Sequence, residues 1–118
     1  RTDLFKLMEK HEKDRLTSGI WWRAVRDEDP LALRAVERAL EAIGAGIASA
    51  INLLDLPLVI VGGGMGDRFF ATHGAQIAQY THVNLFRAGA PPEIVPAALG
   101  DDGGAIGASL LVGGGAGR

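Results

Sequence analysis

The pattern of apolar and polar residues predicts two short helices within residues 1–28. The first has a stripe of apolar side chains at three- and four-residue spacing: Leu4, Leu7 and Met8, with Phe5 at its margin. The second has a similar stripe: Ile20, Trp21, Ala24 and Val25. Thr17 or Ser18 stands at the start of the second helix, where a hydroxyl can accept a hydrogen bond from an exposed amide. Each helix is therefore expected to bury one face.

A long helix is predicted over residues 29–55. Asp29 suits the N-cap position, and Pro30 suits the first helical position because no hydrogen bond is lost there. The predicted inward stripe consists of large aliphatic residues: Leu33, Val36, Leu40, Ile43, Ile47, Ile51 and Leu54. Charged residues occupy the opposite face in the first half only, so the second half is expected to enter the interior as the central helix. Gly44 and Gly46 each cost about 1 kcal/mol of helix stability relative to alanine, which predicts close packing against a neighbour.

Residues 58–112 are predicted to form a strand, a helix, a second strand and a second helix, in that order. Short β-branched runs predict strands at Leu58–Val61 and Glu93–Leu99, and a periodic segment that starts at Asp67 predicts the helix between them. Glycine-rich turns follow both strands, at residues 62–66 and 100–104, and the second turn leads into a helix predicted at Ala105–Val112. Two strands joined by a helix form a parallel unit, so further strands of the sheet are expected outside this sequence. Residues 113–118 are expected to be a flexible tail.

Composition excludes several classes of protein. Of 118 residues, 47% are hydrophobic and 22% charged, which is typical of a soluble globular domain rather than a disordered one. The absence of cysteine excludes disulfides and thiolate sites, and it fits a cytoplasmic location. A net charge of -2 argues against nucleic-acid binding, and the polar interruptions of residues 42–61 argue against a membrane span. No secretory signal is expected from the charged first residues, and the start at Arg1 without methionine suggests a segment of a longer chain.

Candidate catalytic and metal-ligating residues have simpler structural interpretations. The three histidines, His11, His73 and His82, lack ligand spacing, so no metal site is predicted. Asp101 and Asp102 are favoured as helix caps over a catalytic carboxylate pair. Trp21 and Trp22 are favoured as core or domain-contact residues over a stacking surface for a sugar or base. No catalytic residue is predicted in this chain.

The first glycine turn has two open interpretations. Between a strand and a helix, glycines let a ligand touch bare main chain, and a helix start favours anions. The turn nevertheless lacks the Lys-Ser/Thr of a P-loop and the spacing of a dinucleotide fingerprint. A nucleotide contact and a tight turn without a ligand are both compatible with residues 62–66.

Several segments together resemble one family. The stretches "TSGIWWRAV", "AIGAGIASAINLLDLP", "LVIVGGGMG" and "PPEIVPAALGDDGGAIGASLL" resemble, in order and spacing, the end of ROK-family (repressor, open reading frame, kinase) glucokinases. The resemblance implies an α/β fold, namely the C-terminal lobe of an actin-like, RNase H-like ATPase that is helix-rich with a small parallel sheet. It also implies that Gly62, Gly63, Gly64 and Met65 contact the adenosine of ATP. The second glycine run would belong to the connecting helix at the hinge, with Gly104, Gly107 and Ala108 as its packing residues.

The resemblance implies a C-terminal segment of an ATP-dependent hexose kinase, with glucose as the default sugar. The family's phosphate loops, catalytic aspartate and sugar-binding residues precede the matched region, so this chain alone is expected to be inactive. Magnesium and hexose would bind only the full-length protein, whereas the nucleotide would contact this segment. Two alternatives stay open, a sugar-responsive repressor of the same family and a non-catalytic assembly module. A homo-oligomer is expected, either through a native interface or through unpaired strand edges.

Overall fold

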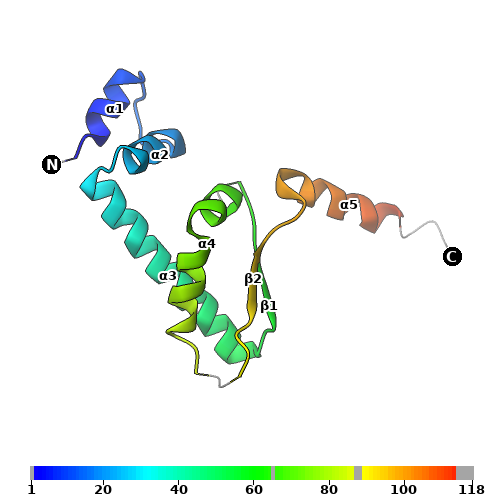
Figure 1. Ribbon diagram of the computed structural model, residues 1–118. Coiled ribbons are helices and arrows are strands. Elements are labelled where there is room, and N and C mark those ends of the chain that lie inside the picture. The colour runs from blue at the N-terminus through cyan, green and yellow to red at the C-terminus, as the bar shows by residue number, and fades with distance from the viewer. Residues whose placement is uncertain (1, 65, 87–88, 114–118) are drawn as a thin grey trace. The chain divides into compact units, whose positions relative to one another are not determined.

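The computed structural model describes residues 2–64, 66–86 and 89–113, without the side chains of residues 67, 101 and 113. The elements follow the order helix, helix, helix, strand, helix, strand, 3₁₀ turn, helix (Figure 1). Their bounds are α1 Leu4–Lys10, α2 Ser18–Arg26, α3 Pro30–Leu54, β1 Leu58–Val61, α4 Gly66–His82, β2 Glu93–Pro96, η1 Gly100–Asp102 and α5 Gly103–Gly113. The chain divides within α3 into two compact units, Arg1–Ala42 and Ile43–Arg118. The predicted order of helices and strands is confirmed.

The first unit packs α1 and α2 around a small apolar core. Its fully buried residues are Leu4, Ile20, Ala24 and Ala32, and the partly buried Leu7, Met8, Trp21 and Val25 pack against them. Thr17 caps α2, because its hydroxyl accepts a hydrogen bond from the Ile20 amide at 3.4 Å. The predicted apolar faces of both helices are therefore confirmed, while Phe5 at the margin is exposed.

The start of α3 is capped as predicted. The carboxylate of Asp29 accepts hydrogen bonds from the amides of Leu31 at 2.9 Å and Ala32 at 3.0 Å. These bonds satisfy two of the amides that a helix start otherwise leaves without a partner. Asp29 is itself buried.

The predicted inward stripe of α3 is confirmed at Leu40 and Ile51 and is wrong at Leu33, Ile43 and Leu54, which are exposed. The helix buries a narrower line that includes small residues: Ala32, Leu40, Gly44, Ala48 and Ile51. Among the large aliphatic residues assigned to the interior, Leu33 is 43% exposed and Leu54 is 64% exposed. The second half of α3 is thus not enclosed, because only the line that faces α4 is covered by the described residues.

A close approach between α3 and α4 explains Gly44 but not Gly46. A Cβ added at Gly44 would lie 2.7 Å from the carbonyl carbon of Tyr80 and 2.9 Å from the amide nitrogen of Thr81. Both atoms belong to the backbone of α4, so the two helices touch along their main chains. At Gly46, no described heavy atom lies within 4 Å of an added Cβ. The expectation of close packing is confirmed at the first glycine and is wrong at the second.

The sheet is small and parallel, as predicted. Residues of β1 and β2 pair in register from Leu58 opposite Glu93 to Val61 opposite Pro96. The second strand is shorter than the predicted Glu93–Leu99. It stops because β1 gives way to the glycine turn after Val61, so that Ala97 makes the last bond, from its amide to the Val61 carbonyl at 2.8 Å.

Helix α4 lies against the sheet and is held at its C-terminal end by two asparagines. Asn52 of α3 donates to the carbonyl of Asn84 at 2.9 Å and accepts from the amide of Phe86 at 3.0 Å. Asn84 in turn donates to the carbonyl of Tyr80 at 2.8 Å. These bonds fix the segment after α4, which leads towards β2. Within the described part of the chain, no helix has the length and apolar character needed to cross a membrane.

Candidate functional site

Two glycine turns leave the same edge of the sheet. Because β1 and β2 are parallel neighbours in register, both strands end on the same side (Figure 1). The first turn joins β1 to α4 at residues 62–66, and the second joins β2 to α5 through η1. Ligands of open parallel sheets bind outside the carboxyl ends of the strands, so this edge is the candidate site.

The first turn exposes bare main chain. Gly62, Gly63 and Gly64 are all exposed to solvent. The turn closes with a hydrogen bond from the Gly66 amide to the Gly63 carbonyl at 2.7 Å. Gly63 has φ +101°, a conformation that residues with a Cβ rarely adopt. Met65, the fourth residue assigned to the adenosine contact, lies outside the described residues.

The three glycines of this turn differ in what surrounds them. A Cβ at Gly62 would lie 2.8 Å from the Cβ of Ala97, the residue directly after β2, so Gly62 permits close approach of the two chain segments. Around Gly63 and Gly64, an added Cβ would have no described heavy atom within 4 Å. The turn therefore faces open space on its outer side, and no bulky side chain among the described residues fills that space.

The second turn contains the 3₁₀ helix η1 and leads into the exposed helix α5. Gly100 has φ +52°, and a Cβ at Gly103 would lie 3.5 Å from the Cβ of Leu99. The predicted packing role of the residues beyond it is not met by the described chain. An added Cβ at Gly104 or Gly107 has no described heavy atom within 4 Å, and Ala108 is exposed. Helix α5 exposes the apolar residues Ile106, Leu110, Leu111 and Val112, and its main contact among the described elements is with η1.

The chemistry available at the site is that of main-chain donors and acceptors. Asp102 lies in the exposed η1 turn, and the side chains of Asp67 and Asp101 lie outside the described residues. The first turn of α4 adds backbone amides, whose partial positive charge favours negative groups. In the described ranges, no group of three His, Cys, Asp or Glu side chains could hold a metal ion. The arrangement can hold a ligand against its main chain, and the described side chains at this edge bring together no nucleophile with a base.

His73, Trp21 and Trp22, which the sequence favours as structural residues, all lie on helices. His73 lies on α4, where its Nδ1 is 2.7 Å from Oε1 of Gln76 and its ring lies 5.0 Å from that of Phe69. Trp21 packs against the core of the first unit, as predicted. Trp22 is half-buried beside it in the same helix. None of these side chains lies at the glycine turns.

Comparison with known proteins identifies the family. The model of the ROK family matches residues 4–114. The chain belongs to the ROK family. This family has the actin-like ATPase fold, so the predicted fold class is confirmed by the match together with the helix-rich structure and its small parallel sheet.

The similar ROK proteins are sugar kinases. The chain is 30% identical over 91 residues to the N-acetylgalactosamine kinase AgaK of Shewanella sp. (strain ANA-3). The aligned region covers 77% of this chain and 29% of that protein. It is 31% identical over 83 residues to an N-acetyl-D-glucosamine kinase of Yersinia pseudotuberculosis serotype O:1b (strain IP 31758), covering 70% of this chain and 27% of that protein. The chain thus spans less than a third of the length of these relatives.

Proposed function

We propose that this chain is the C-terminal segment of an ATP-dependent sugar kinase and that it supplies the adenosine side of the nucleotide site. One observation carries the proposal: in a ROK-family chain, two glycine turns leave one edge of a parallel sheet with bare main chain facing open space. A flat purine nucleoside can approach such a surface closely, because no Cβ keeps it away.

The proposed contacts are made by Gly62, Gly63, Gly64 and Met65. The steric surroundings of Gly64 support this assignment, since neither a positive φ nor a neighbouring atom requires glycine there. A bound nucleoside is a sufficient reason for the absence of a side chain. The amides at the start of α4 would favour the phosphate side of the ligand.

The phosphoryl transfer itself is assigned to other parts of the kinase. Transfer from ATP depends on positioned carboxylates, phosphate-binding loops and magnesium, which neutralises the developing charge. We assign magnesium to the full-length kinase, in which the family's phosphate loops and catalytic aspartate precede the matched region. This segment therefore binds and orients the nucleoside, and by itself it transfers no phosphate.

The identity of the sugar follows from neither glycine turn. The sequence resemblance favours glucose, whereas the similar proteins act, by their names, on N-acetylgalactosamine and N-acetylglucosamine. We propose a hexose or an N-acetylated hexosamine as the substrate class, in a cytosolic enzyme. The kinases among the similar proteins favour this function over a sugar-responsive repressor.

A titration of this chain with ATP tests the nucleoside contact. NMR shifts of the amides at residues 62–64 should change with ATP, and adenosine alone should reproduce most of the change. Gly64→Leu should abolish the response while leaving the free energy of unfolding unchanged, because the new side chain enters open space. Gly46→Leu is the matched control, since Gly46 is also open but lies on α3. An unchanged response in Gly64→Leu would refute the assignment.

A second assay tests the activity of the longer protein. The gene product that contains this chain is incubated with ATP, magnesium and a panel of sugars: glucose, mannose, N-acetylglucosamine and N-acetylgalactosamine. Phosphorylation of at least one sugar is expected. A full-length protein that binds sugar and operator DNA without phosphorylating any sugar would instead support the repressor.

A further inference from the structure

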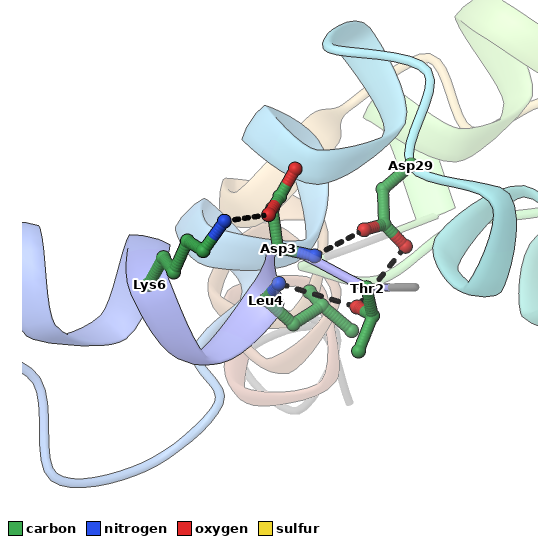
Figure 2. A network of polar contacts seen from close by, with 5 residues as sticks. All are labelled: Thr2, Asp3, Leu4, Lys6 and Asp29. Carbon is green, nitrogen blue, oxygen red and sulfur yellow. Dashed lines mark hydrogen bonds and ion pairs between the residues drawn. The ribbon is translucent and has the colours of Figure 1, made fainter.

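One buried carboxylate joins the N-terminal segment to the start of α3. Asp29 is 6% exposed and accepts four hydrogen bonds. Figure 2 shows the two that come from Thr2 and Asp3. Its Oδ1 accepts from the amides of Leu31 and Ala32 and, at 3.2 Å, from the hydroxyl of Thr2. Its Oδ2 accepts from the amide of Asp3 at 2.6 Å. The two oxygens thus serve different partners, Oδ1 chiefly the cap of α3 and Oδ2 the segment that begins α1.

The hydroxyl of Thr2 extends this network into α1. It accepts a hydrogen bond from the amide of Leu4 at 3.2 Å while it donates to Asp29. The carboxylate of Asp3, by contrast, caps no amide of α1 and pairs with Lys6 at 2.8 Å on the surface. An exposed pair of this kind contributes little to stability. The start of α1 therefore depends on the Thr2 and Asp29 bonds.

Helix α1 needs support from the rest of the unit to be ordered. It has seven residues, far fewer than an isolated helix requires in water. Besides the Asp29 network, its main attachment is Leu4, which is 3% exposed and packs with Ile20, Ala24 and Ala32. Removal of α1 would open this apolar core to solvent. A local opening of α1 would therefore expose this core without unfolding the rest of the chain.

We propose that residues 2–10 form a detachable strap over the apolar core of the first unit and that Oδ2 of Asp29 is the atom that keeps the strap closed. Leu4 contributes the apolar part of the attachment. The hydrogen bond from the Asp3 amide to the charged Oδ2 fixes the orientation of the strap. Release of the strap leaves the cap of α3 in place, because that cap uses Oδ1.

The charged groups around Asp29 do not replace it in this role. A shallow hollow of about 210 Å³ lies beside the carboxylate, and the charged side chains that line it with Asp29 are Asp3, Lys6 and Lys10 of the α1 segment and Asp27 at the end of α2. Lys6 is engaged with Asp3, and Asp27 interacts with Arg26 at the surface. Hydrogen bonds from the amides of Ala32 and Asp3 lower the pKa of Asp29, so its carboxylate is ionised at neutral pH.

Asp29→Asn separates the two roles of the carboxylate. Asparagine is also a good N-cap, so its oxygen can keep the bonds to the start of α3. The other oxygen becomes an NH₂ group that faces the Asp3 amide, and two donors cannot bond to each other. Hydrogen–deuterium exchange of the whole chain should show amides of residues 4–10 exchanging at least about tenfold faster, from the loss of one charge-assisted bond. Amides at the start of α3 should be unchanged.

Asp27→Asn is the matched control, because Asp27 lines the same hollow but is exposed and makes no bond to the strap. Thr2→Val should give an intermediate increase in exchange, since it removes the bonds to Asp29 and to the Leu4 amide. Binding of an apolar dye should rise in parallel as the core opens. Strap exchange in Asp29→Asn equal to that in Asp27→Asn would overturn the proposal. Equal acceleration in the strap and in α3 would overturn it too, because the two roles would then not be separate.

Discussion

The contact between α3 and α4 at Gly44 permits a quantitative test of the fold. In Gly44→Ala the new methyl group would lie 2.7 Å from the carbonyl carbon of Tyr80 and 2.9 Å from the nitrogen of Thr81, whereas ordinary contacts begin at 3.4 Å. Both atoms are backbone, so no side-chain rotation relieves the overlap. The helices would have to separate by more than half an ångström, and overpacking of this kind costs about 1–3 kcal/mol.

Alanine also favours a helix over glycine by about 1 kcal/mol, which offsets part of the cost. We expect a net loss of up to about 2 kcal/mol in the free energy of unfolding for Gly44→Ala. Gly46→Ala provides the matched control, because the same helix gains the same propensity while the methyl group meets no described atom. That variant should gain about 0.5–1 kcal/mol.

Urea denaturation followed by circular dichroism measures both free energies, and hydrogen exchange locates the change. In Gly44→Ala, amides of α4 near Tyr80 should exchange faster, whereas in Gly46→Ala they should not. Equal stability of the two variants, or a more stable Gly44→Ala, would show that α3 and α4 do not touch along their main chains. The arrangement of the second unit would then be wrong.

Three further outcomes are expected. Ile77→Ala should lower the free energy of unfolding by about 2–5 kcal/mol in urea titrations, because Ile77 is 1% exposed, while the 63% exposed Ile60 should tolerate alanine with little change. Hydrogen bonds lower the pKa of Asp29, so the stability that Asp29 contributes is complete above the ordinary aspartate pKa of 3.8 and is lost as pH falls through the lowered value. The protection of the amides of residues 4–10, corrected for intrinsic exchange rates, should therefore fall only in acid, and Asp29→Asn should remove this dependence. The chain alone should self-associate through its open strands, and light scattering that shows a stable monomer at high concentration would contradict this expectation.

Local signals were sufficient to predict most elements. Thr17 and Asp29 each stand before an apolar stripe, and each accepts a bond from an amide in the first turn of its helix. Such caps depend on neighbours within three residues, so a sequence displays them directly. The hydrogen bond from the Asp3 amide to Asp29 joins residues 26 positions apart, so no local sequence pattern predicts it.

The inward face of α3 could not be predicted by the same reasoning. Periodicity ranks large aliphatic residues as buried, and it favoured Leu33 and Leu54 over Ala48. Near Leu33 the small Ala32 is buried instead, in the core with Leu4, Ile20 and Ala24. In the second half of α3, α4 approaches at Gly44, where main chains meet and only small neighbours fit, so Ala48 is buried and Leu54 is exposed. Which line of a helix becomes buried is decided by its partner, and the partner lies 36 residues further along the chain at Tyr80.

The first glycine turn shows a similar limit at the scale of single residues. The order strand, helix, strand predicted two turns at one edge, since parallel neighbours end on the same side. The sequence presents Gly62, Gly63 and Gly64 as equivalent, yet close approach of Ala97 accounts for the first and a positive φ accounts for the second. Packing and backbone conformation leave only Gly64 without a structural reason. A ligand contact is therefore tested most cleanly at this position, where a side chain can be added without disturbing the fold.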